Sequence, residues 1–79
     1  MPIGTAIRHL KNGDWEKAHV IVQEDESALA CWAHGIVHLM EGDNGNARYW
    51  YRRASRPFPK NGDVDGELVA IAAAVKAET

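Results

Sequence analysis

Two histidines, His34 and His38, are the side chains whose type and spacing most directly suggest chemistry. They lie four residues apart in a segment expected to be helical, a spacing that puts both imidazoles on one face and lets them share a metal ion. Glu41 extends the same narrow polar stripe on an otherwise apolar helix. One functional hypothesis is therefore a small ligand- or metal-binding protein or enzyme that uses His34, His38 and Glu41.

A metal site would need a third ligand from another part of the chain. Cys31 begins the same stripe, but it lies seven residues from His38, about 10 Å along a helix axis, so a bend would be needed for both to bind one ion. The third ligand would have to come from another helix, for instance from His9 or His19. With one cysteine in the chain, in an apolar segment that raises its pKa, we expect neither a closed zinc site nor a catalytic thiol.

The alternative interpretation makes the same histidines structural. His9 and His38 lie 29 residues apart and become equivalent when the chain is aligned with itself at that offset. A histidine that is duplicated together with its helix suggests a duplicated packing role, in which the ring is hydrogen-bonded between helices. We favour this interpretation, assign no catalytic residue, and expect no bound metal and no cofactor. Under it, a chelator should leave thermal stability unchanged.

The segment 44–55 brings aromatic and basic side chains together. Helical periodicity leaves Tyr49, Arg52 and Arg53 outside the core face. Arginine binds carboxylates and phosphates through two parallel hydrogen bonds, so these residues form a candidate binding surface. A basic surface along Arg48–Arg56 also raises the hypothesis of a nucleic-acid accessory module. The net charge of −2 argues against that role.

Glycine–aspartate pairs divide the chain into helices. Glycine accepts the left-handed backbone that ends a helix, and aspartate caps the next helix through its side-chain oxygen. Apolar residues recur between the pairs with a helical period, and no segment alternates as a strand would. The pairs are Gly13-Asp14, Gly42-Asp43 and Gly62-Asp63. We expect a single all-α domain over residues 1–79, with about five helices at 3–11, 14–24, 27–41, 44–55 and 64–77.

The same offset of 29 superposes further residues, which indicates a repeated helical hairpin. Its second copy resembles a tetratricopeptide repeat in the residues Gly35, Gly42, Asp43, Ala47, Tyr51, Ala54, Pro59 and Asn61. The resemblance implies two antiparallel hairpins, at about 3–25 and 27–56, followed by a capping helix at about 64–77. The offset is shorter than the usual repeat of about 34 residues. The stretch from His34 to Ala54 also resembles a group of small uncharacterised proteins, which implies no activity.

The function expected from this architecture is protein–protein interaction or self-assembly. Two repeats are fewer than the three or so that usually fold alone, and a short chain has a marginal core. The last helix is apolar beyond one face, so Leu68, Ile71 and Val75 are the expected interface of a homodimer, with a protein or peptide as another partner. No segment has the length or pattern of a membrane span or a signal peptide, so a cytoplasmic location is expected.

Overall fold

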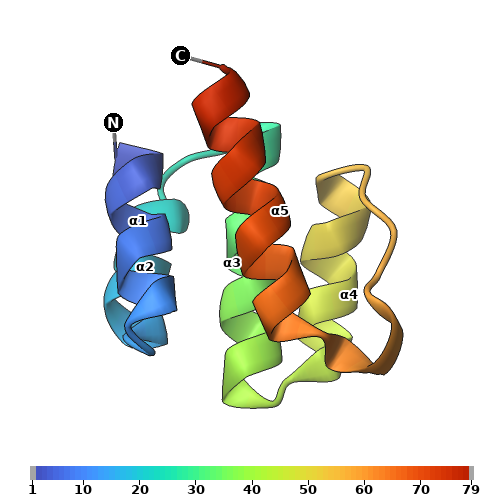
Figure 1. Cartoon of the computed structure of the whole chain (residues 1–79). Coiled ribbons are helices and arrows are strands. Elements are labelled where there is room, and N and C mark those ends of the chain that lie inside the picture. The colour runs from blue at the N-terminus through green and yellow to red at the C-terminus, as the bar shows by residue number, and fades with distance from the viewer. Residues whose placement is uncertain (1, 79) are drawn as a thin grey trace.

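The computed structural model describes residues 2–78. Its α-helices are α1 (Pro2–Lys11), α2 (Trp15–Val22), α3 (Ala28–Glu41), α4 (Asn44–Arg53) and α5 (Val64–Ala77), and a short 3-10 helix, η1 (Lys60–Gly62), precedes α5 (Figure 1). The described residues contain no strand, so the prediction of an all-α chain with about five helices is confirmed. The largest difference in helix bounds is at α2 and α4, which end about two residues earlier than expected.

The turns between helices follow the expected glycine–aspartate chemistry at two places out of three. Gly42 has a left-handed backbone with φ of 87°, and the side chain of Asp43 accepts the N–H of Asn46 at 3.2 Å. Asp63 caps α5 in the same way. The prediction for Asp14 is wrong, because its side chain makes no capping hydrogen bond to α2. That carboxylate lies instead 3.8 Å from the amine of Lys17 on the solvent side.

Helix α3 is the centre of the molecule. It packs against α1, α2, α4 and α5, and every residue from 30 to 39 is buried. Figure 1 places α3 behind α5, with α4 on one side and the α1–α2 pair on the other. A helix that is apolar nearly all round has to be enclosed in this way. Any polar side chain in that buried run therefore needs a hydrogen-bond partner, either one turn away on α3 or on a neighbouring helix.

The contact between α3 and α4 depends on the missing side chain of Gly35. A Cβ atom at this position would lie 2.5 Å from Cδ1 of Tyr51, far inside van der Waals contact. The hydroxyl of Tyr51 donates a 2.6 Å hydrogen bond to Oε1 of Glu67, and Nε1 of Trp32 donates to the same oxygen at 2.9 Å. We call Trp32, Tyr51 and Glu67 the carboxylate node, and it joins α3, α4 and α5.

Helix α5 is covered on one side by its own chain. It packs against α1 and α3, and Ile71 is completely buried there. Leu68 and Val75 are half-buried against the same core, whereas Val69 is 72% exposed. Ile71 therefore belongs to the core of one chain, and an outer contact of α5 would involve Val69 instead. None of the described helices is long and apolar enough to cross a membrane.

Candidate metal centre

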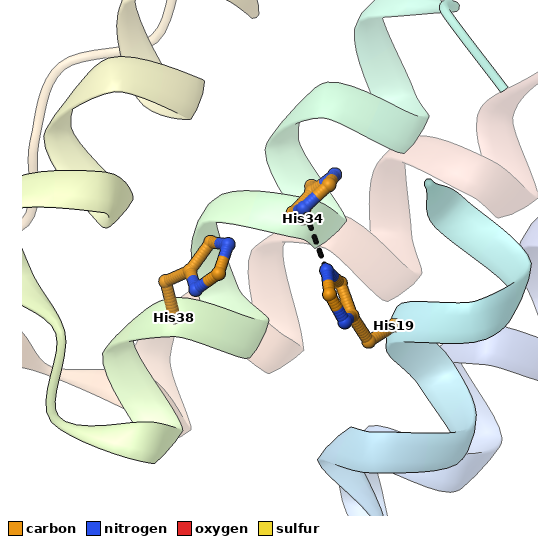
Figure 2. A group of neighbouring side chains, drawn as sticks. All are labelled: His19, His34 and His38. Atoms are coloured by element: carbon orange, nitrogen blue, oxygen red, sulfur yellow. Dashed lines mark hydrogen bonds between the residues drawn. The ribbon is translucent and has the colours of Figure 1, made fainter. Parts of the chain in front are cut away.

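The third histidine that the sequence left undecided is His19, from α2. Its Nε2 atom lies 3.1 Å from Nε2 of His34, and the ring centroids of His19 and His38 are 5.4 Å apart (Figure 2). The rings of His34 and His38 are roughly stacked, with centroids 5.0 Å apart. One nitrogen from each ring falls within 4.8 Å of the other two. We call His19, His34 and His38 the histidine cluster.

Local sequence and helix packing both contribute to this arrangement. His34 and His38 occupy successive turns of α3, so the helix itself stacks them. Ala18 and Val22 are buried where α2 meets α3, and His19 borders that apolar stripe at the half-buried edge of the contact. Two rings of α3 thus meet one ring of α2, and we call this contact between the helices the packing seam. His9 lies outside the cluster.

Burial and aromatic stacking fix the ring of His34. It is 4% exposed, and the indole of Trp50 stacks on it with centroids 3.8 Å apart and planes within 9° of parallel. Burial is the main cause that lowers the pKa of His34 to about 4, and the neighbouring His19, His38 and Arg53 contribute to the same shift. At neutral pH the ring is therefore uncharged. Its Nδ1 atom is buried and has no hydrogen-bond partner among the described residues.

His38 is oriented by a carboxylate. Its Nδ1–H donates a short hydrogen bond to Oε1 of Glu41, one turn further along α3. Because Nδ1 then carries the proton, Nε2 of the neutral ring holds a lone pair available to a ligand. Metal-binding histidines usually have such a carboxylate partner, which sets the tautomer and raises the basicity of the ring.

A second group of potential ligands overlaps the first at His38. Glu41 and Asp43 bring carboxylate oxygens within 4.8 Å of that ring. Asp43, however, is occupied as the cap of α4, where it accepts from the backbone N–H of Asn46 at 3.2 Å and from its side chain at 2.9 Å. These hydrogen bonds, the backbone one first, lower the pKa of Asp43. The two acids therefore supply negative charge beside the histidine cluster.

The spacing of the nitrogens suits an ion of the zinc class. Zinc–nitrogen bonds are about 2.0–2.1 Å long, so two nitrogens on one ion lie at most about 4.2 Å apart. The pair from His19 and His34 already meets this limit, and a nitrogen of His38 lies within 4.8 Å of both, so only a small adjustment of its ring is required. Three imidazoles also leave a fourth, open coordination position, as in zinc sites that bind water or substrate.

The other predicted site residues do not join this cluster directly. The guanidinium of Arg53 lies 4.9 Å from the ring centroid of Trp50 and 5.9 Å from that of Tyr49, so it is connected to His34 through the indole. Arg52 is exposed and makes no ion pair or ring contact within residues 2–78. The predicted surface of Tyr49, Arg52 and Arg53 is thus adjacent to the cluster rather than part of it.

Cys31 is buried in the core, as its position in an apolar segment suggested. Burial raises the pKa of its thiol, and Sγ faces the carbonyl oxygen of Glu26 at 3.9 Å. It has no place in the histidine cluster. The residue that sequence reasoning left undecided is therefore His19, and the residue that it missed is Trp50. Trp50 follows Ala47 by three residues and precedes Ala54 by four, and this helical spacing is the signal in the sequence that it faces the core and could touch His34.

No protein-family model matches the chain, and neither a curated protein nor a solved structure is significantly similar to it. The likeness to tetratricopeptide repeats rests on the sequence motif alone.

Proposed function

We propose that this protein binds a divalent transition-metal ion, with Zn²⁺ as the reference metal, through His19, His34 and His38. The observation that carries the proposal is the convergence of three imidazoles from two helices, with one nitrogen of each within 4.8 Å of the others. Nitrogen ligands of this type suit zinc, copper, nickel and iron, whereas calcium and magnesium prefer oxygen.

The protonation states support a metal over a hydrogen-bonded seam. The pKa of His34 is lowered to about 4, so at neutral pH no proton competes with an ion for this ring. The bond from His38 to Glu41 directs its Nε2 lone pair away from the carboxylate. The packing interpretation favoured from the sequence is thus the hypothesis against which metal binding must be tested.

Metal binding would also add stability to a fold whose core is small. A domain of this length buries too little surface for a large stability, and structural metals are one common supplement. An ion shared by His19 and His34 would join α2 to α3. Because the ion binds the folded chain and not the unfolded one, its binding free energy adds to the stability of the fold. The open coordination position would keep the ion exchangeable.

The test is zinc titration of the untagged, chelator-treated protein by isothermal calorimetry. We expect one ion per chain, and His19→Gln should weaken binding by more than the roughly 10–100-fold that loss of a supporting residue costs. His19 is the best position to change, because it is half-buried and its loss spares the core. Glu41→Gln should weaken binding by about tenfold.

The matched control is His9→Gln, which removes a half-buried histidine outside the cluster. It should bind zinc as the wild-type protein does. Absence of saturable binding, or equal losses in His9→Gln and His19→Gln, would reject the metal site and leave the packing seam.

A second candidate is the interaction or self-assembly role that the helical-hairpin architecture suggests. The supporting observation is that large apolar side chains remain outside on three helices: Val20 is 61% exposed, Tyr49 44% and Val69 72%. Sedimentation equilibrium tests the homodimer. Val69→Glu should weaken a dimer that uses the outer face of α5, and a wild-type chain that is monomeric throughout the micromolar range would exclude it.

A further inference from the structure

We infer that a cleft beside the N-terminal half of α4, which is lined by none of the three clustered histidines, binds a small organic anion with an apolar body. The cleft has a volume of about 570 Å³, within the range of small-molecule sites. Arg48 and Lys60 supply positive charge, Asn44 and Asn61 supply amides, and Leu39 and Phe58 supply apolar wall. None of the lining residues is acidic.

The two cations of the cleft are unpaired. Within residues 2–78, neither Arg48 nor Lys60 forms an ion pair or a side-chain hydrogen bond. The guanidinium of Arg48 lies 4.1 Å from the ring centroid of Phe58, a cation–π contact that holds it while its N–H groups stay free. A guanidinium with free donors binds carboxylate or phosphate through two parallel hydrogen bonds.

The two acids that adjoin cleft residues in the sequence are hydrogen-bonded elsewhere. Asp43 precedes the cleft residue Asn44, but its carboxylate caps α4 and bonds to Asn46. Asp63 follows the cleft residue Gly62, but its carboxylate accepts the N–H of Gly66 at the start of α5. Neither carboxylate lines the cleft. The excess of positive charge is therefore available to a ligand.

The chain from α4 to α5 builds one wall of the cleft in a stiff conformation. Pro57 and Pro59 restrict the backbone on either side of Phe58, whose ring packs edge-on against Tyr51 with centroids 5.5 Å apart. Asn61 and Gly62 both have positive φ, near 60°, which turns the chain sharply after Lys60. A wall fixed in this way loses little conformational entropy when a ligand binds.

The charge and the apolar wall together define the ligand class. A free phosphate would meet the cations but not Leu39 and Phe58, and a neutral ring would meet the wall but not the cations. A carboxylate or phosphate attached to a single aromatic ring would contact both the cations and the apolar wall. The two head groups share the same chemistry of recognition by Arg48, so the experiment includes each of them.

The experiment is a titration of the metal-free protein followed by ¹⁵N–¹H NMR, with phenyl phosphate, benzoate, inorganic phosphate and benzyl alcohol as separate probes. Without metal, an anion bound to an ion at the histidines cannot be mistaken for one in the cleft. We expect saturable shifts at Phe58, at residues 60–62 and near Asn44 with phenyl phosphate or benzoate, and the probe that binds more tightly identifies the head group. Inorganic phosphate should bind at least fivefold more weakly, and benzyl alcohol should give no saturable shift.

Lys60→Gln changes an exposed side chain and should weaken binding several-fold without unfolding the protein. Arg48→Gln should weaken binding about tenfold, and Arg48→Lys should recover only part of the loss, because an ammonium cannot make the paired bonds. Arg52→Gln is the matched control, since it removes an exposed cation of α4 outside the cleft. Absence of saturable shifts with both aromatic anions, or equal weakening by Arg52→Gln and Lys60→Gln, would overturn the proposal.

Discussion

The histidine cluster and the carboxylate node place polar groups on the same central helix in two different ways. In the carboxylate node, one oxygen of Glu67 accepts from Trp32 and Tyr51, so each buried donor has a partner. In the histidine cluster, rings face rings, and Nδ1 of His34 is left without a partner among the described residues. A node completed within the chain contributes to stability by itself. The histidine cluster has no such shared acceptor, and its contribution would increase if the proposed metal ion joined the three rings.

The largest expected effect tests the carboxylate node, in which every buried donor has a partner. Glu67→Ala leaves the indole N–H of Trp32 and the hydroxyl of Tyr51 unpaired, and both side chains are almost fully buried. At about 1–3 kcal/mol for each unpaired group, the free energy of unfolding should fall by about 3 kcal/mol in urea denaturation. Asp65→Ala is the control from the same turn of α5, and it should cost less than about 1 kcal/mol. Equal losses would mean that the node does not stabilise the fold.

The next largest effect is the pH dependence of stability, which tests the histidine cluster. Burial first, and then the neighbouring rings and Arg53, lower the pKa of His34 to about 4, whereas an unfolded histidine titrates near pH 6.5. Between these values the unfolded chain takes up a proton that the folded chain refuses. Stability should therefore be fully present above pH 6.5 and should fall by about 2.5 kcal/mol as the pH decreases to about 4.5.

Denaturation midpoints measured at pH 7.5, 5.5 and 4.5 check this prediction. His34→Gln should remove most of the loss between pH 6.5 and 4, whereas His9→Gln should retain it. If His34→Gln and the wild-type protein lose the same stability across that range, the ring of His34 is not the group responsible.

The smallest effect tests the close packing of Gly35 against Tyr51, which positions the hydroxyl of the carboxylate node. Gly35→Ala puts a Cβ atom 2.5 Å from Tyr51, whose ring is buried and has to move. Overpacking destabilises by about 1–3 kcal/mol, whereas the higher helix propensity of alanine stabilises by about 1 kcal/mol. We therefore expect the free energy of unfolding to fall by about 1 kcal/mol. Gly4→Ala is the control, because a Cβ there meets nothing within 4 Å and should not destabilise α1. A Gly35→Ala protein as stable as Gly4→Ala would show that α4 shifts freely.

The features that could be predicted from the sequence are those decided within a few residues. A left-handed glycine and a capping aspartate act locally, so the end of α3 at Gly42 and the start of α4 after Asp43 could be located in advance. The stacking of His34 and His38 follows from their spacing of four. Asp14 shows the limit of such reasoning, because the same residue type in the same motif pairs with a lysine instead of capping α2.

The third member of the histidine cluster was decided only by tertiary structure. His9 and His19 were equal candidates in the sequence, and only the packing of α2 on α3 brings His19 to His34. Glu67 reaches Trp32 across 35 positions of chain, and Ile71 is enclosed by α1 and α3 rather than left for a partner. Periodicity identifies which side of a helix is apolar, but many helix arrangements bury the same sides. The choice among them depends on packing between distant residues, such as the missing side chain of Gly35 against the ring of Tyr51.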